Sequence, residues 1–253
     1  MDKSTIAGVF IAVTGIVLGL LLEGGSLTQI LQPTAAMIVF GGTLGAVMIQ
    51  FPLPVVIEAA KRFAGVIVEP KATADLKIKE MVSYAHKARQ EGIVALDGNL
   101  EAIDDPFLKK ALMLAVDGTE PSELRNIMDV ELDCKAEREE QIPKLFESAG
   151  GFSPTIGIIG AVLGLIQVMQ HLDKIDEVGR GIAVAFVATI YGVAAANLLF
   201  LPAAGKLKLR IREEQLMREL ALEGVVSILE GMNPRMLESK LHGFLAEEME
   251  KAQ

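Results

Sequence analysis

The chain has 253 residues, 51% of them hydrophobic, and a formal net charge of −9 at pH 7. This acidic balance, without a basic stripe, argues against binding to nucleic acid. The single cysteine, Cys134, excludes a disulfide framework. The mean hydropathy of +0.41 is high for a soluble protein of this size, and the charged residues cluster in separate blocks. Both features point to a protein embedded in a membrane.

Four stretches contain no Asp, Glu, Lys or Arg: Ser4–Leu22, Gly24–Ile57, Ser153–Leu172 and Gly181–Gly205. A helix that crosses a bilayer core of ~30 Å needs about 20 apolar residues. One such run could be a buried core helix, but four are hard to bury in a chain of this length. The sequence therefore predicts four membrane-spanning helices, at about 4–22, 34–54, 154–172 and 182–204.

The first stretch has an alternative interpretation as a cleaved signal peptide, because Gly24-Gly25-Ser26 resembles a small-residue cleavage site. Its apolar part, Ile6–Leu22, is longer than the hydrophobic region of a usual signal peptide. The start of the chain is also barely basic, since Asp2 offsets Lys3. We therefore expect a retained helix.

The predicted spans form two pairs, within residues 1–57 and 153–205, and a hydrophilic block, 58–152, lies between the pairs. A hydrophilic tail, 206–253, follows the last span. All but two of the 24 lysines and arginines lie at the N-terminus, in the block or in the tail. The positive-inside rule then predicts that the block, the tail and both chain termini are cytoplasmic.

The block and the tail have helical patterns, with apolar stripes at helical spacing and turn residues between them. The expected helices cover residues 75–90, 107–116, 122–149 and 207–229, and a last one begins at Asn233-Pro234. Pro143 is expected to kink the third of these. Because no sustained strand alternation occurs, the predicted fold class is an all-α membrane protein with a helical cytoplasmic domain.

The predicted spans contain no Asp, Glu, Lys or Arg, and His171 lies only at the edge of the third. Proton relays place Asp, Glu or His at membrane depth. If the chain conducts ions, a partner chain should therefore supply a carboxylate. Polar residues that could line a path are Thr14, Thr43, Gln50, Thr155, Gln167, Thr189, Tyr191 and Asn197. For each, the alternative is a hydrogen bond to a carbonyl of its own helix.

Small residues recur four positions apart in every predicted span, as at Gly160/Gly164 and Ala188/Gly192. They let helix backbones approach closely in lipid, either within one four-helix unit or between several copies. Two prolines also fall at the spans. Pro154 is expected to open the third helix, and Pro202 to kink the fourth near its cytoplasmic end.

Several motifs follow one another at characteristic spacing: Lys87–Asp97, Phe107–Gly118, Ser153–Ile166, Ala183–Gly192, Leu201-Pro202, Glu223-Gly224, Leu229–Gly231 and Asn233-Pro234. Each is weak by itself. Their order and spacing over nearly the whole chain resemble the MotA/PomA family of flagellar motor stator subunits. The resemblance implies that the protein works in the bacterial inner membrane, without a cofactor.

The mechanism implied by this resemblance is consistent with the absence of Asp and Glu from the predicted spans. The resemblance implies that five copies form a ring around two copies of a single-span partner, MotB or PomB. The partner's membrane Asp would carry the ion, and its periplasmic domain would grip peptidoglycan. Ion passage would rotate the ring about the partner, and the cytoplasmic domain of the ring would turn the rotor protein FliG.

The resemblance also implies roles for individual residues. Arg89 matches the rotor-facing arginine of the family, and Asp97 matches its rotor-facing acid, which is Glu in most members. As solvated surface charges they would contribute only about 0–1 kcal/mol, but complementary charge can still orient a partner. Pro154 and Pro202 match the prolines that couple ion flow to movement.

Three further residues match the ion pathway of the family. Thr189 corresponds to the threonine near the partner's Asp, and Phe186, about one turn earlier, would face the same region. Ala161 stands where sodium-driven members have Thr. Because a bare Na⁺ needs several oxygen ligands and alanine removes one, the sequence predicts proton coupling.

Other functions remain as alternatives. An ExbB/TolQ-type energiser of the outer membrane has a similar plan but usually three spans. A stand-alone channel or solute carrier would conduct without a partner, and a membrane scaffold would not transport at all. No enzyme is indicated, because the sequence has no phosphate-binding glycine loop, no metal-ligand cluster and no nucleophile paired with a histidine.

Overall fold

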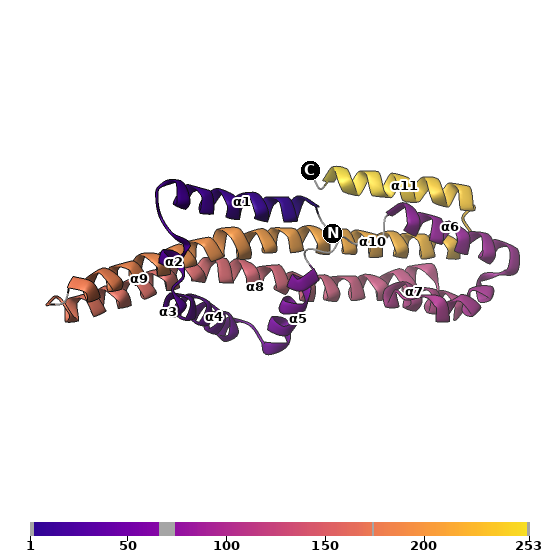
Figure 1. Ribbon diagram of the computed structural model, residues 1–253. Coiled ribbons are helices and arrows are strands. Elements are labelled where there is room, and N and C mark those ends of the chain that lie inside the picture. The colour runs from indigo at the N-terminus through magenta and orange to yellow at the C-terminus, as the bar shows by residue number, and fades with distance from the viewer. Residues whose placement is uncertain (1–2, 66–73, 174, 252–253) are drawn as a thin grey trace. The chain divides into compact units, whose positions relative to one another are not determined.

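The computed structural model describes residues 3–65, 74–173 and 175–251. This described part is almost entirely helical and contains no strand, which confirms the all-α class (Figure 1). The chain divides into two compact units. Unit 1 comprises Met1–Glu69 and Glu140–Lys208, and unit 2 comprises Pro70–Glu139 and Leu209–Gln253.

Unit 1 contains the helices that can cross a membrane. Its elements are α1 (Lys3–Leu22), α2 (Leu27–Ile30), α3 (Pro33–Ala36), a π-helical turn (Met37–Gly41), α4 (Gly42–Gln50), α5 (Leu53–Ala64), the later part of α8 (Pro121–Gln170), α9 (Ile175–Ala194), a second π-helical turn (Ala195–Phe200) and the start of α10 (Leu201–Leu229). By length and composition, the described residues hold four candidate spans: Ser4–Leu22, Pro33–Gln50, and windows within Pro121–Gln170 and Val178–Leu229. The number of predicted spans is therefore confirmed.

The third span is not a separate helix. α8 continues for 50 residues from Pro121 to Gln170 and passes through Pro143 and Pro154. The expectation that Pro154 opens a helix is therefore wrong. A change from charged to apolar residues next to a proline resembles a helix start in sequence, but here the same helix extends from polar surroundings into the apolar region.

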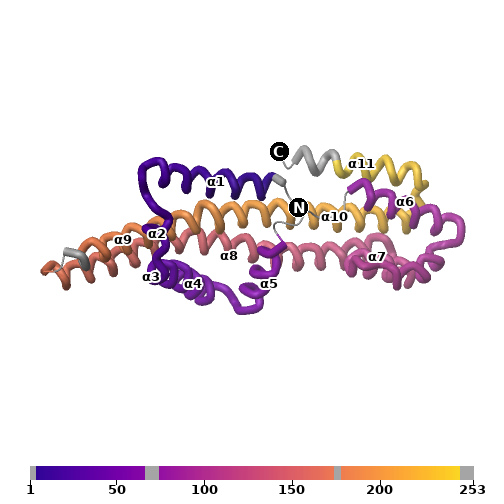
Figure 2. Tube along the Cα trace, in the orientation of Figure 1, coloured from indigo at the N-terminus to yellow at the C-terminus, as the bar shows by residue number. Residues whose placement is uncertain are grey.

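The fourth span also continues into the hydrophilic tail. α9 leads through the second π-helical turn directly into α10, so that Pro202 is the second residue of α10 (Figure 2). Proline has no N–H to donate, and its ring clashes with the carbonyl four residues earlier in a regular α-helix. The wider π-helical turn just before Pro202 relieves this clash.

The third and fourth spans pack backbone against backbone. A Cβ atom added at Gly157 would lie 2.8 Å from the carbonyl oxygen of Ala188, and one added at Gly192 would lie 2.5 Å from that of Ser153. No larger side chain fits at such positions. The glycines of this helix pair therefore serve packing within the chain. By contrast, a Cβ atom at Gly15 of α1 would meet nothing within 4 Å.

A second cluster of unit 1 joins α5 to α8 and α10. α4, which precedes α5, ends at Gln50, because Phe51 is extended and Pro52 follows. α5 then packs Phe63 against Phe146 of α8, with ring centroids 5.4 Å apart. The buried members of the cluster are Val47, Ala59, Ile142, Leu145, Phe146, Ala149, Ala203, Ala204 and Leu207.

Unit 2 is a helical bundle with its own hydrophobic core. It is built from α6 (Ala74–Glu91), a 3₁₀ helix (Ile93–Ala102), α7 (Pro106–Val116), the early part of α8, the later part of α10, and α11 (Pro234–Lys251). Its largest fully buried side chains are Ile78, Met81, Leu96, Phe107, Leu108, Leu112, Leu124, Met128, Leu220, Leu237 and Leu241.

Local chemistry sets the helix ends in unit 2. Gly92 ends α6 and Gly118 follows α7, each with a positive φ, of 86° and 82°, that glycine tolerates without strain. Asp105 caps α7 by accepting hydrogen bonds from the amides of Phe107 and Leu108. Asn233 likewise accepts a hydrogen bond from the amide of Arg235 at the start of α11.

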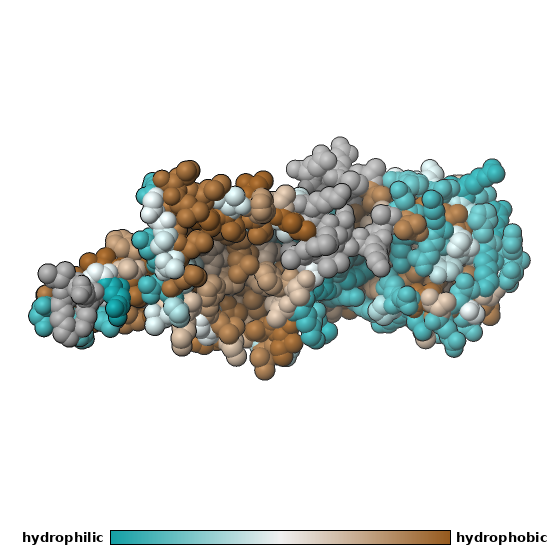
Figure 3. All heavy atoms as spheres, viewed as in Figure 1, coloured by the Kyte–Doolittle hydropathy of each residue, from teal (hydrophilic) through white to brown (hydrophobic). Residues whose placement is uncertain are grey.

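The two units differ in the surface they expose. Unit 1 is covered by apolar side chains, among them Phe10, Met37, Ile49, Met169 and Phe186, whereas hydrophilic residues dominate the visible surface of unit 2 (Figure 3). An apolar surface of this extent is typical of contact with lipid or with other membrane helices.

Candidate functional site

Polar side chains of the spans mostly bond to backbone carbonyls. Thr189 donates to the carbonyl of Ala185 over 3.3 Å, and Asn197 donates to that of Val193 over 2.9 Å. Ser153, fully buried on α8, donates across the helix pair to the carbonyl of Gly192 over 3.0 Å. This interhelical bond was not expected from the sequence, because Ser153 lies at the edge of the third apolar run.

The three ion-pathway residues lie on the packed pair α8 and α9. Phe186 and Thr189 are one turn apart on α9, and Ala161 is on α8. Phe186 is 69% exposed, whereas Thr189 and Ala161 are half-buried. In the single chain, the Phe186 face of α9 is thus uncovered. The apolar runs 153–172 and 181–205 of these helices contain no Asp or Glu.

The two prolines adjoin close contacts between these helices. Pro154 is half-buried on α8, and a Cβ atom added at Gly192 would lie 3.1 Å from the Cα atom of Pro154. Pro202 is exposed, but its neighbour Leu201 fills the space above Gly150, where an added Cβ atom would lie 2.6 Å from the Leu201 side chain. Both prolines therefore lie where α8 meets the chain of the fourth span.

Tyr191 fastens the connection between the first two spans to α9. Its hydroxyl donates to the carbonyl of Ile30 over 2.5 Å and accepts from the amide of Gln32 over 3.2 Å. Ile30 is the last residue of α2 and Gln32 directly precedes α3, so both backbone groups lie at helix ends, where helices leave them unpaired. The sequence suggested Tyr191 only as a lining residue, since nothing local reveals a partner about 160 positions away.

The two rotor-facing candidates are exposed in unit 2. Arg89 lies near the end of α6, and Asp97 lies in the 3₁₀ helix that follows Gly92. Lys87 donates to the side chain of Asn99 over 2.5 Å, which ties the 3₁₀ helix to α6. The two predicted residues are therefore carried by one connected surface segment.

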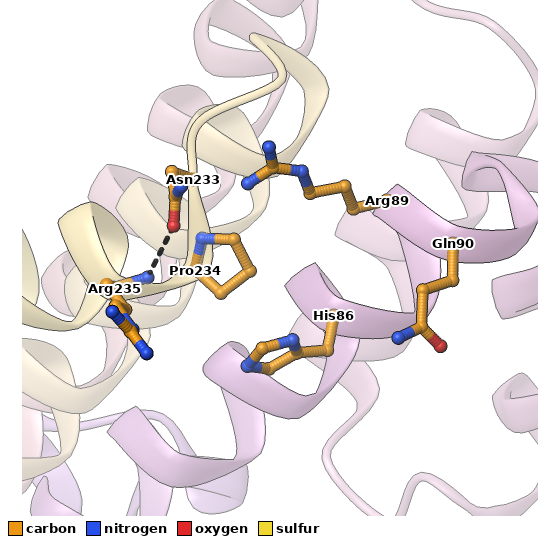
Figure 4. A pocket seen from close by; sticks show the side chains of 6 residues that line it. All are labelled: His86, Arg89, Gln90, Asn233, Pro234 and Arg235. Atoms are coloured by element: carbon orange, nitrogen blue, oxygen red, sulfur yellow. Dashed lines mark hydrogen bonds between the residues drawn. The ribbon is translucent and has the colours of Figure 1, made fainter.

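Arg89 also lines a cleft that the sequence did not predict. The cleft measures about 440 Å³ and is lined by His86, Arg89, Gln90, Asn233, Pro234 and Arg235 (Figure 4). Its walls come from the end of α6 and the beginning of α11. Asp97 is not part of this lining.

Ion pairs link helices α8, α10 and α11 within unit 2. Glu223 of α10 accepts from Arg125 of α8 over 2.6 Å and pairs with Lys240 of α11. Burial opposes ionisation of Glu223, but the two cations outweigh it and lower the pKa of this carboxyl. Arg218 of α10 forms a second, bidentate pair with the buried Glu139 of α8, over 2.8 and 3.0 Å.

Comparison with known proteins agrees with this architecture. Residues 99–220 match the MotA/TolQ/ExbB proton channel family, and residues 6–92 match the N-terminal region of motility protein A. Motility protein A of Bacillus subtilis is 37% identical over 97% of this chain and 91% of its own length.

Solved structures give the same result. The chain is similar to a chain of the flagellar MotAB stator complex from Bacillus subtilis, with a TM-score of 0.87, 36% identity and full coverage of both chains. Its similarity to C. jejuni MotAB gives a TM-score of 0.89 at 32% identity, over 96% of both chains. Fold and spans together define a multi-pass membrane protein, and the family match places it in the MotA/TolQ/ExbB class. Within that class, the chain belongs to the motility protein A family.

Proposed function

We propose that the protein is a stator subunit of the bacterial flagellar motor, which converts a proton gradient into torque together with a MotB-type partner. The observation that carries this proposal is that four apolar runs of this motility protein A relative contain no Asp, Glu, Lys or Arg: Ser4–Leu22, Gly24–Ile57, Ser153–Leu172 and Gly181–Gly205. Such a chain can build the wall of an ion path, but it needs another chain's carboxylate to transfer a proton.

The assembly would be a homopentameric ring in the inner membrane around two single-span, peptidoglycan-binding partners, with the chain termini and unit 2 in the cytoplasm. Exposed apolar faces support contacts with other helices and lipid. α1 has none of its apolar window buried, and Phe186 is 69% exposed on α9. The MotAB complexes supply the precedent.

The ion path would run along the Phe186 face of α9. Phe186 would exclude water beside the partner's carboxylate, and Thr189 would offer a hydroxyl in exchange for its present bond to Ala185. Ala161 contributes no oxygen, which supports proton over sodium coupling because a desolvated Na⁺ needs oxygen ligands.

Coupling of ion passage to movement would use the two prolines. Pro154 removes one backbone donor from the interior of α8, and Pro202 follows a π-helical turn. Such positions let a helix bend without breaking regular hydrogen bonds elsewhere. Arg89 and Asp97, exposed on unit 2, would then transmit the movement to the rotor protein FliG by complementary charge.

A deletion strain tests the function. Removal of the gene should abolish swimming while leaving flagellar filaments assembled, and the intact gene should restore swimming. Swimming speed should not depend on external Na⁺ at fixed membrane potential. Normal swimming after deletion would refute the stator role, and a strict Na⁺ requirement would refute proton coupling alone.

A further inference from the structure

The cleft between α6 and α11 carries one arginine on each wall. Arg89 comes from α6, together with His86, and Arg235 comes from the first turn of α11. Figure 4 shows the two arginines on opposite sides of the Pro234 ring, with His86 on the α6 wall. The lining contains no Asp or Glu.

The two arginines of this cleft differ in their partners from Arg125 and Arg218 of unit 2. Arg125 and Arg218 each pair with a carboxylate between helices. For Arg89 and Arg235 no ion pair occurs among the described residues, although the chain as a whole carries a net charge of −9. The positive end of the α11 helix dipole adds to the same field. The cleft is therefore a local site of positive potential on an acidic protein.

Arg235 stands on a rigid support. Pro234 beside it is buried, and Leu237 and Leu241 of the same helix are fully buried in the core. Lys240 of α11 pairs with Glu223 and donates to the Ser227 hydroxyl over 3.0 Å. Because α11 is anchored in this way, the backbone from which the Arg235 side chain extends is fixed on the wall opposite Arg89.

We propose that this cleft receives an acidic side chain of a protein partner, with Arg235 as a second arginine that acts together with Arg89. Planar guanidinium groups bind a carboxylate with two parallel hydrogen bonds, and His86 supplies a further polar contact. The inference rests on the proposed function, because the partner is then an acidic segment of the rotor. It adds α11 to the rotor-facing surface, separate from Asp97.

Charge reversal tests the proposal. Arg235→Glu should reduce motor torque about tenfold, because it replaces attraction by repulsion at a partner surface. Arg235→Lys should give an intermediate torque, because it keeps the charge but loses the two parallel hydrogen bonds of the guanidinium. The matched control is Arg138→Glu, an exposed arginine of unit 2 that does not line the cleft, and it should leave torque unchanged. Membrane abundance and recruitment of a fluorescently tagged stator should be normal in all three.

Suppressor selection identifies the occupant. Second-site mutations that restore swimming to Arg235→Glu should replace an acidic residue of the rotor protein with a neutral or basic one. If Arg235→Glu swims like Arg138→Glu while deletion of the whole chain still abolishes swimming, the cleft proposal fails and the stator function stands. Normal swimming after deletion refutes the function itself. Binding of inorganic phosphate that is lost in Arg235→Glu, with unchanged torque, would show a small-anion site and overturn the proposal.

Discussion

At the scale of single residues, the buried ion pair between Glu139 and Arg218 is a demanding contact. Both side chains are largely shielded from solvent, and Arg218 also lies 3.3 Å from the carboxylate of Glu214. Removing charges from water is costly, and a good geometry merely offsets that cost. Removal of one partner should therefore destabilise the protein more than replacement of both.

We expect Glu139→Gln to lower the stability of the protein by about 3 kcal/mol, because it leaves the Arg218 charge buried and poorly compensated. The double variant with Met at both positions should recover most of this loss. Lys144→Met, in the exposed pair with Glu140, is the matched control and should change little. Thermal unfolding of the purified protein measures all three. Equal effects of Glu139→Gln and Lys144→Met would show that burial of the pair is unimportant.

The lowered pKa of Glu223 predicts a dependence on pH. A carboxyl with a lower pKa in the folded state than in the unfolded state stabilises the fold above the unfolded pKa, and this contribution is lost as the pH falls. Glu223→Gln should therefore be less stable than the native protein at pH 7. The difference should shrink below about pH 4.3, where unfolded Glu is protonated. Melting temperatures between pH 7 and about pH 2.5, a range that extends well below the pKa of unfolded Glu, provide the measurement, and a constant difference would contradict the assignment.

At the scale of elements, the third and fourth spans cross with their backbones in close contact at Gly192. We expect Gly192→Ala to destabilise this pair by about 1–3 kcal/mol, because the new Cβ atom must displace backbone. Gly205→Ala on α10 is the matched control, since a Cβ atom there meets nothing within 4 Å. Protease resistance of the membrane-inserted protein should fall only for the first variant. Equal protease resistance of Gly192→Ala and Gly205→Ala would contradict the prediction that packing at Gly192 stabilises the helix pair.

Sequence reasoning succeeded where local chemistry determines an element. Apolar length predicts the spans, and the ends at Gly92, Pro106 and Asn233-Pro234 follow from glycine, proline and capping preferences. It failed at Pro154, because tertiary packing keeps α8 helical through a residue that usually interrupts helices. The 3₁₀ helix and the π-helical turns have no distinct local signal either.

The candidate site also combines features that the sequence predicts with features that depend on tertiary packing. The exposed positions of Arg89 and Asp97 are compatible with the resemblance to the stator family, whereas their roles stay predictions. The cleft that joins Arg89 to Arg235 was beyond sequence reasoning, since it depends on the packing of α6 against α11 across more than a hundred residues. The bond from Tyr191 to Ile30 depends on folding in the same way.

At the scale of the whole molecule, the distribution of charge defines what the chain can do. Its candidate spans expose apolar and small residues, whereas its acidic and basic side chains gather in hydrophilic segments. A path along such spans has no proton acceptor of its own in the described residues. We therefore propose that the chain depends on a carboxylate from another polypeptide, and membership in the motility protein A family favours a MotB-type subunit as its source.

Proton flux into liposomes tests this dependence most directly. Vesicles that contain the purified chain alone should acidify no faster than empty vesicles under a membrane potential. Vesicles that contain the chain together with its MotB-type partner should conduct protons, and replacement of the partner's membrane Asp by Asn should abolish the flux. Rapid acidification by the chain alone would contradict the account.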